Sequence, residues 1–161
     1  MLDIANPDLW FFLCTLPICL IVAFYDLKYM KIPNWTVLTL IALFVVVGFL
    51  VLPLEIYIWR YVGLLVVLVV GFLLSTIKMV GAGDAKFAAA AALYIAPADA
   101  GFVIILLALM GPIALLFHRI LGRLYMKRAF PDWESFQRTR EFPWGLPLTA
   151  TLVLYLALEA F

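Results

Sequence analysis

Long apolar runs alternate with short polar breaks along most of the chain. Spanning a bilayer takes a helix of about 20 mostly apolar residues, and four runs have this character: 9–25, 35–52, 59–77 and 100–117. A fifth run, 144–158, is shorter but equally apolar, and an alanine-rich stretch lies at 85–96. Small residues allow helices to pack closely in lipid. The pattern therefore predicts an all-α bundle of six transmembrane helices, of which the fourth is short and buried.

The breaks between these runs contain residues that end helices. Pro33, Pro53 and Pro97 each stand between two apolar runs, and proline keeps the preceding residue extended. The longest polar stretch, 119–142, precedes the last run. We find no repeat and no linker, so we expect residues 1–161 to form a single integral membrane domain.

Composition supports a membrane protein. Hydrophobic residues make up 68% of the chain, whereas soluble domains contain about 45–50%. The formal net charge is only +1, so we expect lipids and no nucleic acid as partners. Cys14 and Cys19 both lie in the first apolar run and do not share a helix face. We therefore expect neither a disulfide nor a cysteine-based metal site.

Basic residues predict the orientation of the bundle. With six helices, all of the 11 Lys and Arg residues except Arg60 fall on one side. The positive-inside rule places that side in the cytoplasm. Both termini then lie on the opposite, periplasmic side of the membrane.

Two carboxylates are candidates for chemistry. Asp26 directly follows the first apolar run, and Asp84 opens the short fourth helix, which contains the alanine-rich stretch 85–96. Both are therefore expected on the cytoplasmic side at similar depth. Two carboxyl groups in one site share a proton, because ionising both is costly. One can then activate water while the other protonates a carbonyl, as in aspartic proteases. This chemistry requires no metal, no cofactor and no nucleophilic side chain.

Residues near Asp26 and Asp84 are compatible with a catalytic role for the two aspartates and also with a purely structural one. Gly81 and Gly83 permit positive φ and close backbone approach. The chain can then turn sharply and place Asp84 on the first turn of its helix, near free N–H groups. Asp84 could instead be a simple N-cap, and Asp26 could begin a solvated loop. Lys86 would extend to the headgroups or lie beside Asp84. The basic stretch 119–140 would rest on anionic lipid or, as the less favoured alternative, dock a substrate.

Three motifs resemble those of a known family. The stretch GAGDAKF is similar to the G-x-G-D-x-K signature of the type IV prepilin leader peptidases, and DLKYMKIPNW resembles the region around their first catalytic aspartate. The stretch EFPWGLPLTA is similar to the opening of their last helix, although Trp144 and Leu146-Pro147 depart from the usual pattern. The resemblance implies that Asp26 and Asp84 are the catalytic pair. It implies a supporting role for the remaining motif residues: Gly81, Gly83, Lys86, Pro33 and Asn34.

The resemblance also implies an activity and a location. It suggests an aspartic endopeptidase of the bacterial inner membrane that cleaves the leader of prepilins or pseudopilins on the cytoplasmic side. The substrate would have a short basic leader followed by a hydrophobic helix. Because the sequence contains no CxxC motif, we expect a short form without the methyltransferase domain of longer relatives, similar in size to the members that serve tight-adherence (Flp) pili. Two other functions remain open from the residues alone: a small ion-coupled or proton-coupled transporter, and a non-catalytic membrane assembly factor.

Overall fold

The computed structural model describes residues 6–122, 127–138 and 141–161, and within them the regular structure is entirely helical. The expected all-α class is therefore confirmed. The elements are α1 (Pro7–Tyr29), α2 (Asn34–Leu43), η1 (Phe44–Gly48), α3 (Phe49–Val51), α4 (Leu54–Thr76), α5 (Ala82–Ala92), η2 (Pro97–Asp99), α6 (Ala100–Leu121), α7 (Lys127–Ala129), α8 (Glu134–Gln137) and α9 (Gly145–Ala160). The π-helix η1 joins α2 and α3 into one continuous segment.

Local sequence signals explain where several helices begin and end. The Asn6 side chain accepts a hydrogen bond from the Asp8 N–H (2.9 Å), and Pro7 occupies the first turn of α1, where a missing N–H costs nothing. Met30 ends α1 by adopting a left-handed conformation with φ 53°. Pro33 precedes α2 and Pro53 precedes α4, each in an extended conformation.

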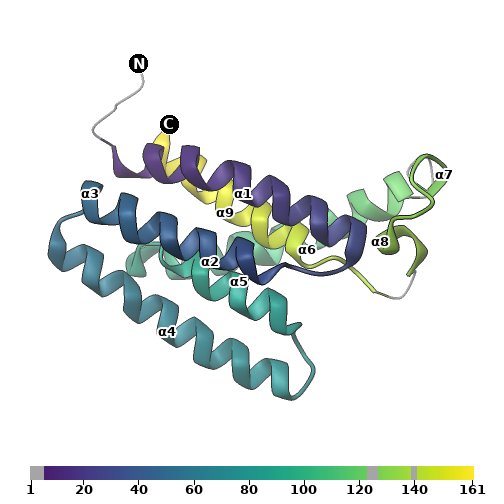
Figure 1. Cartoon of the computed structure of the whole chain (residues 1–161), viewed down its shortest axis with the longest axis horizontal. Coiled ribbons are helices and arrows are strands. Elements are labelled where there is room, and N and C mark those ends of the chain that lie inside the picture. The colour runs from purple at the N-terminus through teal and green to yellow at the C-terminus, as the bar shows by residue number, and fades with distance from the viewer. Residues whose placement is uncertain (1–5, 123–126, 139–140) are drawn as a thin grey trace.

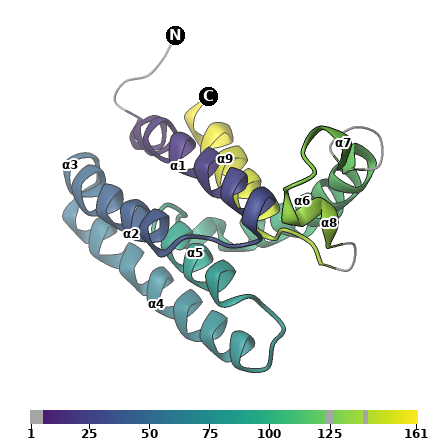
Figure 2. The same cartoon turned by 45° about the vertical axis from the view of Figure 1, so that its right-hand side comes forward.

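The long helices run antiparallel, so their ends gather at two opposite ends of the molecule (Figures 1 and 2). One end, here called the α8 end, contains the end of α1, the starts of α2, α5 and α9, and the short helices α7 and α8. The other contains both chain termini. Helix α1 packs along α9, α4 along α5, and α6 along α9.

An aromatic and aliphatic core holds the helices together. Phe11 stacks on Phe44 at 5.7 Å between ring centroids, and Tyr94 meets both rings edge-on. The Tyr94 hydroxyl donates to the Leu40 carbonyl at 2.7 Å, so the polar end of this buried side chain is satisfied. Helices α1, α2 and the end of α5 are thereby joined.

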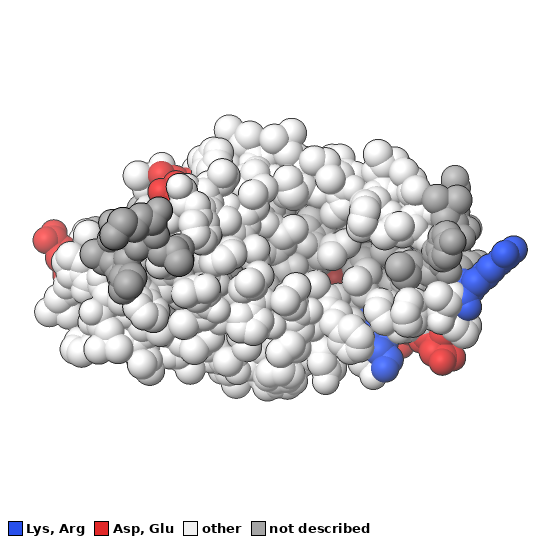
Figure 3. Space-filling view, turned by 90° about the horizontal axis from the view of Figure 1, so that it is seen from above, with Lys and Arg blue, Asp and Glu red and all other residues white. Residues whose placement is uncertain are grey.

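The outer surface is that of a membrane protein. Four segments are long and apolar enough to cross a bilayer: Pro7–Tyr29, Asn34–Val51, Leu54–Thr76 and Pro97–Leu121. Many large apolar side chains on them are exposed, as expected where lipid is the solvent. In Figure 3 the middle of the molecule carries almost no charge, and Lys and Arg appear only toward the α8 end.

The short helices differ in part from expectation. Helix α5 has 11 residues, about 17 Å of helix, and α9 has 16, so neither reaches the length of the four spans. The expected count of six spans therefore stays a prediction. Helix α5 begins at Ala82 instead of Ala85 and ends at Ala92, while α4 begins at Leu54 instead of Trp59.

Candidate active site

A cavity of about 1160 Å³ lies at the α8 end of the bundle. Its walls come from the end of α1, the connection to α2, the loop before α5, and the segment from α8 to the start of α9. Asp26 and Asp84 both line it. They are close enough for the charge of Asp84 to act on Asp26. The structure thus brings the two predicted carboxylates, far apart in the sequence, to one site.

Asp26 lies in the last turn of α1, not after the helix as expected from the sequence. Its carbonyl accepts the Met30 N–H at 2.9 Å, which closes that turn. The side chain is only 4% exposed, and its Oδ2 accepts the backbone N–H of Gly145 at 2.7 Å. Asp26 is therefore a buried, oriented carboxyl and does not begin a solvated loop.

Gly145, the first residue of α9, can contact Asp26 because it has no side chain. A Cβ at this position would lie 2.8 Å from Asp26 Oδ2 and 3.0 Å from its Cβ, closer than such atoms approach in proteins. Because residue 145 is glycine, the first turn of α9 can contact the Asp26 carboxyl and donate its N–H. The N-terminus of a helix stabilises a negative charge placed there. Gly145 was not among the predicted site residues, although the motif that contains it pointed to this stretch.

Asp84 is the third residue of α5, in its first turn, as expected. The N-cap is Gly81, so the interpretation of Asp84 as N-cap is wrong. Instead the Asp84 carboxylate accepts the Gly81 N–H, which is the acidic half of a capping box. Burial raises the pKa of Asp84 to about 6, although this hydrogen bond lowers it. A carboxyl with such a pKa can give or take a proton near neutral pH.

The two glycines of the motif differ in how closely they approach their neighbours. No glycine that the structure describes has a positive φ, and Gly81 is extended at φ −65°, so the expectation of positive φ at Gly81 and Gly83 is wrong. A Cβ on Gly81 would lie 2.5 Å from Asp84 Oδ2. Gly83 faces Ile32, whose Cβ would be 3.4 Å from an added Cβ. The expected close approach is therefore found at Gly81, against Asp84, whereas a Cβ on Gly83 would make only an ordinary contact with Ile32.

Lys86, Pro33 and Asn34 join α5 to the start of α2. Lys86 Nζ donates to Asn34 Oδ1 at 3.0 Å. Pro33 precedes α2, and its carbonyl accepts the Thr36 hydroxyl at 2.7 Å. Pro33 and Asn34 line the cavity, whereas Lys86 stands outside its lining. Lys86 therefore ties the two motifs together.

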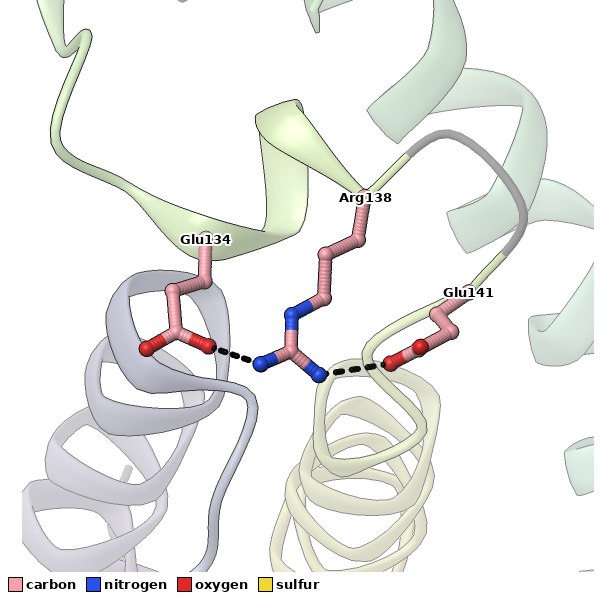
Figure 4. Close-up of polar contacts among 3 residues, drawn as sticks. All are labelled: Glu134, Arg138 and Glu141. Carbon is pink, nitrogen blue, oxygen red and sulfur yellow. Dashed lines mark hydrogen bonds and ion pairs between the residues drawn. The ribbon is translucent and has the colours of Figure 1, made fainter.

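The segment between α6 and α9 supplies cavity walls that the sequence did not predict. Glu134, Glu141, Phe142 and Trp144 all line the cavity. Arg138 lies between the two glutamates and pairs with Glu134 at 2.7 Å and Glu141 at 3.0 Å (Figure 4). These side chains are 40–58% exposed, so the pairs add little stability but place charge at the mouth of the site.

Aromatic contacts hold this segment on the bundle. Phe136 stacks on His118 of α6 at 4.8 Å, and Trp133 meets Phe24 of α1 edge-on at 5.5 Å. Parts of the basic stretch, 123–126 and 139–140, lie outside the described residues. The described part packs against protein, and its expected contact with anionic lipid stays a prediction.

The sequence profile of the type IV leader peptidase family matches residues 13–122. This is more than half of the 161 residues, and the match includes Asp26, the connection to α2, and the loop with Gly81, Gly83 and Asp84. The chain belongs to the type IV leader peptidase family, as the motifs suggested. No curated protein and no solved structure matches it in the corresponding comparisons.

Proposed function

We propose that the chain is an aspartic endopeptidase of the bacterial cytoplasmic membrane that removes the leader of prepilins or pseudopilins. Membership of a peptidase family supports the general reaction. The observation that carries the proposal is the joint placement of Asp26 and Asp84 in one cavity, where their charges interact. A pair of carboxyl groups is sufficient to hydrolyse a peptide bond.

In the proposed mechanism the two carboxyl groups share one proton. The ionised carboxylate takes a proton from a water molecule, whose oxygen attacks the scissile carbonyl carbon. The protonated carboxyl gives its proton to the carbonyl oxygen, forming a tetrahedral intermediate. The intermediate collapses when the C–N bond breaks: the leaving nitrogen receives a proton from one carboxyl group, and a hydroxyl of the intermediate returns a proton to the other, so that the pair again holds one proton. Either aspartate can begin as the base, because each carboxylate accepts one backbone N–H.

The orientation that we propose follows from charge. The α8 end contains Lys28, Lys31, Lys78 and Lys86, so by the positive-inside rule it faces the cytoplasm. The cavity then opens at the cytoplasmic edge of the bilayer, and both termini lie on the outside. A leader held on the cytoplasmic side could enter the cavity without crossing the membrane.

The test is cleavage by variants with one carboxyl removed. We expect Asp26→Asn and Asp84→Asn each to lower the rate of leader removal by at least about 10²- to 10⁴-fold, the usual contribution of general acid–base groups. Cleavage is measured by the shift of a prepilin-like substrate on a gel after co-expression, with membrane insertion checked by fractionation.

The matched control is Asp132→Asn. Asp132 is exposed, belongs to the same end of the molecule, and does not line the cavity, so this variant should cut at the rate of the unaltered protein. Normal processing by either Asp26→Asn or Asp84→Asn would overturn the two-carboxyl mechanism.

A further inference from the structure

A second hollow lies outside the site described above, between α4 and α6. It has a volume of about 420 Å³. Helix α4 packs on α5, and α6 packs on α9, so α4 and α6 form the two walls while α5 and α9 form the floor. We call this hollow the α4–α6 groove. It opens toward lipid, because Val66 on one wall and Ile104 on the other are 55% and 68% exposed.

The groove has the lining of a helix-packing surface. Its side chains are apolar except for Arg60 and Thr151. The floor and one wall contain several small residues, among them Gly63, Ala88, Ala91 and Ala92. Small residues at such positions allow the backbone of another helix to approach closely in a membrane. An apolar helix therefore fits the groove better than a polar ligand.

Helix α5 connects the groove with the candidate active site. Residues three or four apart share a face of a helix, so Asp84, Ala88 and Ala91 lie along one face of α5. Asp84 lines the cavity at one end of this face, and Ala88 and Ala91 form the floor of the groove one to two turns further on. A helix lying in the groove would thus have its end beside the aspartate.

The far end of the groove contains buried hydrogen-bond donors. Arg60 is 6% exposed, and its Nε and Nη1 have no hydrogen-bond partner among the described residues. Tyr155 forms a hydrogen bond with the guanidinium, and Asp8 and Asp99 act on its charge, but Nε and Nη1 remain without a partner among the described residues. Gly63 of α4 lies beside the Ala92 carbonyl of α5, 3.4 Å from an added Cβ, and Arg60 is about one turn further along α4. A substrate helix that starts beside Asp84 and runs along α5 would therefore reach the level of Arg60 after about three turns. An acceptor on that helix would complete the site.

We propose that the α4–α6 groove binds the apolar helix of the substrate, with the scissile bond at the helix end next to Asp84. This inference rests on the proposed function, because it concerns the same reaction. Binding the helix on the face of α5 that carries Asp84 positions the bond that precedes the helix. It also selects membrane-embedded substrates over soluble peptides.

Two pairs of exposed, lipid-facing residues provide the test. Val66→Trp and Ile104→Trp fill the groove from its two walls. Val69→Trp and Ile105→Trp are the matched controls on the same helices, since these residues are 58% and 60% exposed and do not line the groove. All four changes affect side chains that already face lipid, so folding should be preserved, as checked by thermal unfolding.

Each variant is assayed with two substrates: a prepilin-like protein with its apolar helix, and a peptide truncated a few residues after the scissile bond. We expect the groove variants to cut the helical substrate at least about tenfold more slowly than the controls, and all four variants to cut the truncated peptide equally. Equal rates for groove and control variants on the helical substrate would overturn the inference, as would equal slowing on both substrates. Failure of the unaltered protein to cut either substrate would overturn the proposed function and this inference with it.

Discussion

Each candidate catalytic carboxyl is held by the backbone of a glycine. Asp26 accepts the Gly145 N–H, and Asp84 accepts the Gly81 N–H. A backbone donor cannot rotate away as a side chain can, so it fixes the orientation of the carboxyl group. At both positions a Cβ would collide with the carboxylate oxygen. Gly81 and Gly145 are therefore positioning residues.

Replacing Gly145 tests this role. In Gly145→Ala the new Cβ would meet Asp26 Oδ2 at 2.8 Å, so either the carboxyl or the start of α9 must shift. Displacement of a catalytic group by about 1 Å can cost about 100-fold in rate, and overpacking costs about 1–3 kcal/mol of stability. We expect leader cleavage and the melting temperature both to fall, measured by gel shift and by thermal unfolding.

Gly101→Ala is the matched control. Gly101 also lies in the first turn of a helix, but a Cβ there would have no neighbour within 4 Å. Its cleavage rate and melting temperature should equal or slightly exceed those of the unaltered protein. Cleavage by Gly145→Ala at the same rate as Gly101→Ala would show that the Asp26–Gly145 contact does not position the carboxyl.

At this scale the sequence predicted the acids but not what holds them. Asp26 and Asp84 stand out because charged residues are rare in so apolar a chain. Gly145 is separated from Asp26 by 119 positions, and no local pattern indicates which residue a helix start will contact. Gly81 was singled out for positive φ and for close backbone approach; its φ is negative, but its close approach to Asp84 is found.

At the scale of helices, apolar run length was a good guide and exact ends were not. The four long spans coincide with four predicted runs to within a few residues. Helix α5 begins earlier than predicted, because Ala82, Gly83 and Asp84 form its first turn. The apolar run alone starts at Ala85, whereas the glycine motif correctly placed Asp84 in the first turn of the helix.

The contact between α4 and α5 sets the position of Asp84. At Gly71 an added Cβ would lie 2.9 Å from the Cβ of Ala85, the residue that follows Asp84. In Gly71→Val the helices must separate and carry Asp84 away from Asp26. We expect a loss of about 1–3 kcal/mol in the free energy of unfolding and a clear fall in the cleavage rate.

Gly101→Val serves as the control for this change, because the same side chain is added to an apolar helix at a position where an added Cβ meets nothing within 4 Å. Its effect should be limited to the small propensity difference between the residues. If Gly71→Val retained the stability and the cleavage rate of Gly101→Val, close α4–α5 packing would have no role in placing Asp84.

At the scale of the whole molecule, antiparallel helices place the polar connections at two ends and leave an apolar belt between them (Figure 3). The charge pattern predicted which connections share an end. It did not predict that the segment with Glu134 and Glu141 would wall the cavity, because that segment has no periodic pattern. Its position depends on contacts such as Phe136 on His118, which only the folded chain brings together.

The central claim is that Asp26 and Asp84 share one cavity, and cross-linking measures this most directly. In a background with Cys14 and Cys19 replaced by alanine, the pair Asp26→Cys and Asp84→Cys is treated in membranes with a short bismaleimide and weighed by intact-mass spectrometry. The pair Asp8→Cys and Asp84→Cys is the control, because Asp8 lies about 27 Å from Asp26 along α1. We predict that one reagent molecule joins the two cysteines of each chain in the first pair, and that the control pair carries two separate adducts. Two separate adducts in both pairs would contradict the shared site.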